Sequence, residues 1–191
     1  MNNIDCKHLE KNILRFHKAA TTLACKASGV KSGFELLHYP VFVAKGSVIV
    51  AYTCGEPDED YFTTFIVNAS FTLEMLLKAI IYYESGEWES GHNLIKLYQE
   101  VSTDSKRVIN NRFKELCKKN GAYGRPLKQM QAHVGTKIKL NMVEVLQASS
   151  TAFESWRYAF DTTRNNPAFV AYGEAYQALT ERKESILNSK T

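Results

Sequence analysis

The sequence predicts an all-α protein built as a bundle of about six helices, and three observations favour this class. Apolar residues recur at spacings of three and four along most of the chain. Residues 61–84 contain neither glycine nor proline, and breaker residues divide much of the remainder into helix-length pieces. The 191 residues suit a single domain, in which we expect residues 1–57 to form an N-terminal helix with an irregular extension and residues 58–188 to form the core bundle.

The N-terminal part is predicted to be an amphipathic helix over residues 5–27, followed by a segment with two interpretations. The apolar stripe of the helix consists of Leu9, Ile13, Leu14, Phe16, Ala20 and Leu23. Over residues 40–52, β-branched runs flank Lys45-Gly46, and this pattern predicts a short β-hairpin. In a helical protein the same run can instead form a buried, irregular helix, so both interpretations stay open.

Residues 61–84 show the pattern of a central bundle helix. Its broad apolar face consists of Phe62, Phe65, Ile66, Ala69, Leu73, Leu76, Leu77 and Ile80. Glu74 and Lys78 are one turn apart on a flank of this face, where they can pair against apolar neighbours. Such a structural pair is the alternative to a chemical role for Glu74.

The second half of the chain predicts several further helices with short connections. Asn93 or His92 is expected to cap a helix that runs to Val101, and Asp104 to cap a helix over residues 108–119. A long helix is predicted over residues 137–163, and Asn165-Asn166-Pro167 separates it from a last helix over residues 169–187.

Positive charge is concentrated in one stretch of the sequence. Residues 104–140 hold ten lysines and arginines against two acidic residues, whereas the whole chain has a net charge of +4. This asymmetry predicts a surface for phosphate or another acidic partner, and the alternative is a solvated helix face. The residues expected to bind nucleic acid are Lys106, Arg107, Arg112, Lys118, Lys119, Arg125 and Lys128.

Several classes of site find no support in the sequence. The four cysteines are spread singly, without the spacing of a zinc site, so we expect reduced thiols, no metal and no cofactor. No glycine-rich phosphate loop or nucleophile elbow is present. No uninterrupted apolar run approaches the length of a membrane span, and the polar start lacks a signal-peptide core, so a cytoplasmic protein with no membrane partner is expected.

Three segments in order resemble the HEPN superfamily, in particular bacterial HEPN domain-containing proteins. Residues 65–78 resemble that family's helix of small, apolar and Glu…Lys residues. Gly91-His92-Asn93-Leu94 is similar to its Gly-His-Asp-Leu step. The segment around Trp156-Arg157-Tyr158 resembles its late helix, and the resemblance covers about half of the chain, residues 61–161.

The resemblance implies a helical bundle that often dimerises and, in many members, a metal-independent RNA endonuclease of toxin–antitoxin or antiphage systems. Such nucleases use an Arg-x4–6-His motif on a late helix. This sequence departs from the motif because no histidine follows His133. We therefore expect an RNA- or nucleotide-associated homodimer, in which any ribonuclease activity uses a nonstandard catalytic set of Arg157, His92 and Glu74. The alternative is a degenerate, non-catalytic module for dimerisation or for binding a partner protein, in which His92 is a capping residue and Arg157 an ion-pair residue.

Overall fold

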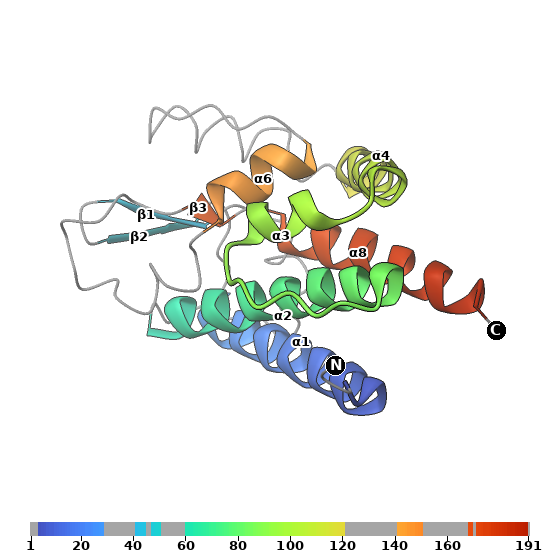
Figure 1. Cartoon of the computed structure of the whole chain (residues 1–191). Helices are drawn as coiled ribbons and strands as arrows, with labels where there is room; N and C mark the ends of the chain where they lie inside the picture. The colour runs from blue at the N-terminus through green and yellow to red at the C-terminus, as the bar shows by residue number, and fades with distance from the viewer. Residues whose placement is uncertain are drawn as a thin grey trace.

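The computed structural model is an all-α helical bundle with a small antiparallel sheet at one side (Figure 1), which confirms the predicted fold class. The structure describes residues 4–28, 41–44, 47–50, 60–120, 141–150, 168–169 and 171–190. Its helices are α1 (Cys6–Ser28), α2 (Asp60–Ser85), α3 (Leu94–Glu100), α4 (Thr103–Asn120), α6 (Met142–Ala148) and α8 (Tyr172–Asn188). Its strands are β1 (Val41–Ala44), β2 (Ser47–Val50) and β3 (Ala168–Phe169).

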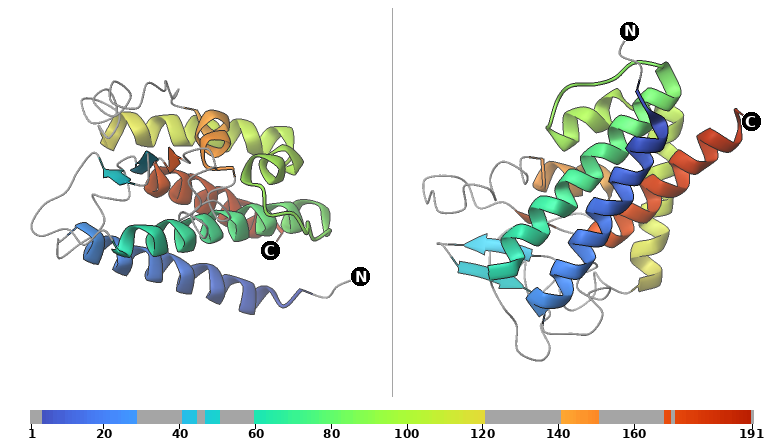
Figure 2. Two further views of the ribbon diagram at one scale, coloured as in Figure 1. Left: turned by 90° about the vertical axis from the view of Figure 1, so that its left-hand side faces the viewer. Right: turned by 90° about the horizontal axis from the view of Figure 1, so that it is seen from below.

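Helix α2 is the centre of the bundle. All eight residues of its predicted apolar face are at most 2% exposed. Helix α1 packs along one side of α2 and α8 packs along another, while α3 lies beside α2 and α4 lies against α8 (Figure 2). Helix α2 also has the length and composition of a membrane span over Tyr61–Ser85, but 78% of an apolar 18-residue stretch within it is buried inside the protein. A helix that is apolar on most sides is what the centre of a bundle requires.

Helix α1 turns one face towards its neighbours and the opposite face outward. Leu9, Ile13 and three alanines, among them Ala20, are buried on the inner face. Leu14, which the apolar spacing assigned to the inner stripe, is 48% exposed, so that assignment is wrong. Each residue turns about 100° around the helix axis, and Leu14 therefore lies well to one side of the inner line through Ile13 and Ala20.

Two polar clusters fasten α1 to its neighbours. The Tyr83 hydroxyl of α2 donates to Glu10 Oε1 at 3.0 Å, and Lys183 of α8 pairs with the other oxygen of the same carboxylate. Farther along α1, the His17 ring stacks on Tyr176 at 3.6 Å between centroids, and its Nδ1 lies 2.9 Å from the Tyr172 hydroxyl. Burial lowers the pKa of His17 below its ordinary value, so the neutral ring is favoured in the folded protein.

The small sheet confirms the hairpin interpretation for residues 40–52. Strands β1 and β2 are antiparallel, and the pairing of Ala44 with Ser47 leaves a two-residue connection between them. Strand β3 pairs with the other edge of β1, with Phe169 opposite Val41. The expectation that the last helix begins at Phe169 is therefore wrong. Helix α8 begins at Tyr172, because Phe169 takes its backbone partners from the sheet.

The expectation of one continuous helix over residues 137–163 is also wrong within residues 141–150, while the rest of that range lies outside the described residues. Asn141 has extended backbone angles and caps α6 by accepting from the Glu144 N–H, so the helix begins at Met142. It ends at Ala148, where the Ser149 N–H turns back to carbonyls of the preceding turn. The Ser150 N–H likewise turns back, to the Gln147 carbonyl at 3.3 Å, so the helix ends at this pair of serines despite the continuing apolar spacing. The Ser150 carbonyl instead accepts the Leu94 N–H at 3.3 Å.

Candidate functional site

A buried carboxylate on α2 is the centre of the candidate site. The Glu74 side chain is 2% exposed, and Lys78, one turn later, is 7% exposed. The Lys78 ammonium lies 2.9 Å from Glu74 Oε1, so the ion pair expected from the i,i+4 spacing is present. The close approach of the two charges offsets much of the desolvation cost of burying them, so that removing one partner alone would be costly.

His92 joins this pair from the connection between α2 and α3. Its Nδ1 lies 2.9 Å from Glu74 Oε1, the same oxygen that Lys78 contacts. The His92 side chain is 57% exposed, so the ring reaches solvent while its Nδ1 meets the buried carboxylate. An ionised carboxylate only accepts hydrogen bonds, so a hydrogen bond here requires the proton on Nδ1, and the tautomer with that proton has its lone pair on Nε2.

Asn93, rather than His92, caps α3. Its side-chain oxygen accepts the Lys96 N–H at 3.1 Å, which confirms one of the two predicted caps for this helix. The imidazole of His92 contacts Glu74 instead. Adjacent residues in the same connection thus have separate tasks, because Asn93 begins the helix and His92 faces α2.

Trp88 covers the ion pair from the same connection. The Lys78 ammonium lies 5.8 Å from the centroid of the Trp88 ring, a distance at which a cation is attracted to an aromatic face. Tyr82 meets the same ring edge-on at 6.3 Å between centroids. Glu74 Oε2, the second oxygen of the carboxylate, is buried and has no hydrogen-bond partner within the part of the chain that the structure describes.

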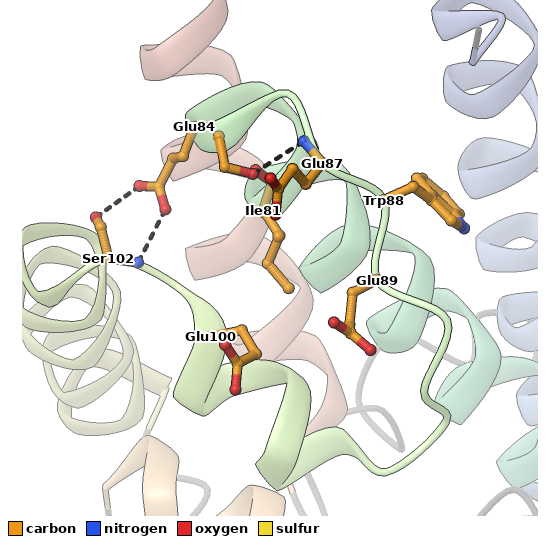
Figure 3. Close-up of a pocket in the computed structure, with 8 residues that line it drawn as sticks. Ile81, Glu84, Glu87, Trp88, Glu89, Glu100 and Ser102 are labelled. Atoms are coloured by element: carbon orange, nitrogen blue, oxygen red, sulfur yellow. Dashed lines mark hydrogen bonds between the residues drawn. The ribbon is translucent and has the colours of Figure 1, made fainter. Parts of the chain in front are cut away.

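An acidic pocket of about 390 Å³ lies between the end of α2, the connection that follows it and the end of α3 (Figure 3). Its lining residues are Ile81, Glu84, Ser85, Glu87, Trp88, Glu89, Glu100 and Ser102. Four of these eight are glutamates and none is basic. Helices α2 and α3 both end here without a basic residue in the last turn, so their carbonyl ends add negative potential. The pocket therefore disfavours phosphate and favours cations.

Glu84, in this pocket, holds the start of α4. The N–H and the hydroxyl of Ser102 donate to its two oxygens at 2.9 and 2.7 Å. Ser102 in turn accepts the Ser105 N–H at 3.2 Å and so caps α4, which begins at Thr103. The expectation that Asp104 is the cap is therefore wrong: Asp104 lies in the first turn and pairs with Arg107 and with Arg182 of α8.

The predicted nucleic-acid residues on α4 divide into two groups. Lys106 donates to the Gln99 carbonyl at 2.9 Å, and Arg107 pairs with Asp104. Arg112 makes two hydrogen bonds to Glu181 of α8, at 2.6 and 3.0 Å, and lowers the pKa of that carboxyl. The two arginines are therefore paired with carboxylates, whereas Lys106 is held by a neutral carbonyl and keeps its charge.

Lys118 and Lys119 form the second group and are exposed in the last turn of α4. Arg125 and Lys128 lie outside the described residues, as does Arg157, the third member of the expected catalytic set. The structure thus brings Glu74 and His92 together and does not place Arg157. The sequence pattern did not single out Trp88 or the acidic pocket, although four glutamates spaced around a tryptophan over residues 84–100 are a visible signal.

Within the described ranges, no group of three or more histidine, cysteine, aspartate or glutamate side chains has the arrangement of a metal site. The chain matches no family model, no curated protein and no solved structure.

Proposed function

We propose that this protein is a HEPN-like RNA- or nucleotide-associated protein whose reactive group is His92. One observation carries the proposal: a solvent-accessible imidazole is held at Nδ1 by a carboxylate that is 2% exposed. Glu74 and His92 come from two of the three segments that resemble the HEPN superfamily. Their contact supports the idea that these segments form a site together.

The geometry suits proton transfer at an RNA 2′-hydroxyl. His92 Nε2 accepts the hydroxyl proton, the 2′-oxygen bonds to phosphorus, and the 5′-oxygen leaves and takes a proton from solvent. Glu74 stabilises the protonated ring and fixes its tautomer, which makes it a positioning residue. Lys78 neutralises Glu74 and is too enclosed to bind a phosphate itself.

The proposal is tested by incubating purified protein with mixed RNA at low ionic strength. His92→Ala is expected to lower cleavage about 100-fold or more, the usual contribution of a general base. His8→Ala is the matched control, because His8 is an exposed histidine outside the site. Absence of both cleavage and salt-sensitive RNA binding in the unaltered protein contradicts the proposal. Equal cleavage by both variants removes His92 from the chemistry.

A non-catalytic interaction module is the second candidate, and the acidic pocket favours it. Four glutamates beside Trp88 suit a basic segment of a partner protein better than they suit a phosphate chain. Within the described residues the exposed large apolar side chains are Leu14 and Val143, on different helices, so a partner here would be held mainly by charge. This candidate predicts that His92→Ala changes stability alone, and that sedimentation shows association with a partner or a second copy.

A further inference from the structure

The outward face of α1 carries a row of positive charge that the charge count along the sequence did not single out. Its members are Lys7, Lys11, Arg15, Lys18 and Lys26, and all five are exposed. Successive members are separated by three, four or eight residues, so they follow one side of the helix. Helix α1 lies at an outer edge of the bundle, where this side is not covered by another described helix (Figures 1 and 2).

The row is straight and long. At 100° per residue, its five members fall within about 100° of the helix circumference, opposite the face that packs on α2. At 1.5 Å per residue, the distance from Lys7 to Lys26 is about 28 Å along the axis. The other large exposed side chains on this part of the helix are His8 and Leu14. A single exposed leucine does not make a broad apolar surface beside the row.

Among the described residues, no carboxylate neutralises the charges of this row. None of the five cations forms an ion pair within that part of the chain, and Arg15 contacts only the Asn12 side chain there, at 3.3 Å. Glu10, the one acidic residue in the sequence of α1, is turned inward to Lys183 and Tyr83. The arginines of α4, by contrast, are paired with acidic side chains of α4 and α8.

We propose that this cationic row on α1 binds the phosphate backbone of RNA. A linear polyanion offers a charge at every nucleotide and can follow a straight row of lysines without a defined register. A protein partner is disfavoured because lysine is depleted in protein interfaces and the row lacks an apolar centre. A bilayer is disfavoured because the apolar face of α1 is already buried against α2.

This inference rests on the proposed function for the identity of the polyanion as RNA. It adds a binding surface on a helix other than α4 and separate from the Glu74–His92 contact. The two proposals can be tested independently, because substitutions that remove charge from α1 leave Glu74, Lys78 and His92 unchanged.

The test measures binding of a fluorescein-labelled single-stranded RNA of mixed sequence by anisotropy, as a function of salt. The α1 variant combines Lys11→Gln, Arg15→Gln and Lys18→Gln at exposed positions, and glutamine is a good helix former. The matched control combines Lys114→Gln, Lys118→Gln and Lys119→Gln, which removes the same charge from exposed positions of α4. Circular dichroism checks that both variants keep their helix content.

Five phosphate contacts predict a slope of about −3.5 in log K against log salt, and loss of three predicts about −1.4. Between about 50 and 200 mM salt the unaltered protein then loses about 100-fold in affinity and the α1 variant about 7-fold. The inference is overturned if the α4 variant lowers the slope as much as the α1 variant does. It is also overturned if the α1 row binds anionic vesicles or an acidic peptide as tightly as RNA. No RNA binding by the unaltered protein overturns it as well, and RNA cleavage that depends on His92 would then leave the proposed function standing.

Discussion

Removing the buried carboxylate of α2 while leaving its cation in place should strongly destabilise the fold. In Glu74→Leu, Lys78 keeps a 7% exposed side chain but loses the oxygen at 2.9 Å, and the Trp88 ring at 5.8 Å is its remaining partner among the contacts described above. An uncompensated charge of this kind costs about 3–5 kcal/mol of unfolding free energy. The ring of His92 also loses its contact with Glu74.

The double variant separates charge imbalance from lost packing. Glu74→Leu combined with Lys78→Met replaces both charges by apolar side chains, and such replacements of buried pairs are often nearly neutral. We therefore expect the double variant to recover most of the stability lost in Glu74→Leu, with a coupling energy of about 2 kcal/mol or more. Urea denaturation followed by circular dichroism gives the free energies for this cycle.

Glu115→Leu is the matched control. Glu115 also pairs with a cation, Arg112, but its side chain is 67% exposed, and exposed pairs contribute about 0–1 kcal/mol. A loss of unfolding free energy below about 1 kcal/mol in Glu74→Leu would refute the argument from burial, and so would a double variant no more stable than Glu74→Leu.

The double variant also tests the proposed chemistry, because it retains His92 without its positioning carboxylate. Full RNA cleavage by that stable variant would contradict the role proposed for Glu74.

Two further predictions concern the core. His17 has a pKa below its unfolded value, so the folded state resists protonation, and unfolding free energy should fall as pH drops below about 6.5. His17→Gln should reduce that dependence, and urea midpoints at several pH values would show it; an unchanged dependence would mean that other groups cause it. Leu76→Ala should cost about 2–5 kcal/mol because Leu76 is fully buried, whereas Leu14→Ala should cost less than about 0.5 kcal/mol at its exposed position. Similar losses in thermal unfolding would contradict the placement of these two leucines.

The central elements follow closely from local sequence pattern. The apolar face of α2 is so broad that its helix and its burial are both predicted by spacing, and the Glu74–Lys78 pair follows from i,i+4 geometry. The hairpin was one of two open interpretations, because a short β-branched run satisfies a strand and a buried helix equally well. Pairing with β3 decides between them, and that partner lies more than a hundred residues away.

The errors in helix boundaries have a common physical origin. The apolar spacing continues through residues 137–163. The Asn141 side chain nevertheless begins α6 by accepting the Glu144 N–H, and the Ser149 backbone N–H closes its last turn. Asp104 has a capping side chain, yet Ser102 takes that position because Glu84 from α2 holds it there. In these cases hydrogen bonds, and not hydrophobicity, set the helix boundary: the side chains of Asn141 and Ser102 make them at two helix starts, and the Ser149 backbone N–H makes them at the end of α6.

The helical class, the central helix and its carboxylate–ammonium pair can be predicted without any structure, because they depend on contacts within a few turns of one helix. Which charges are available to a partner depends instead on the tertiary fold. The fold brings His92 to Glu74 across 18 residues, engages Arg112 with Glu181 across 69, and leaves the lysines of α1 exposed. Formal charge is a property of composition, but the net field of a surface depends on which oppositely charged groups the fold places beside it.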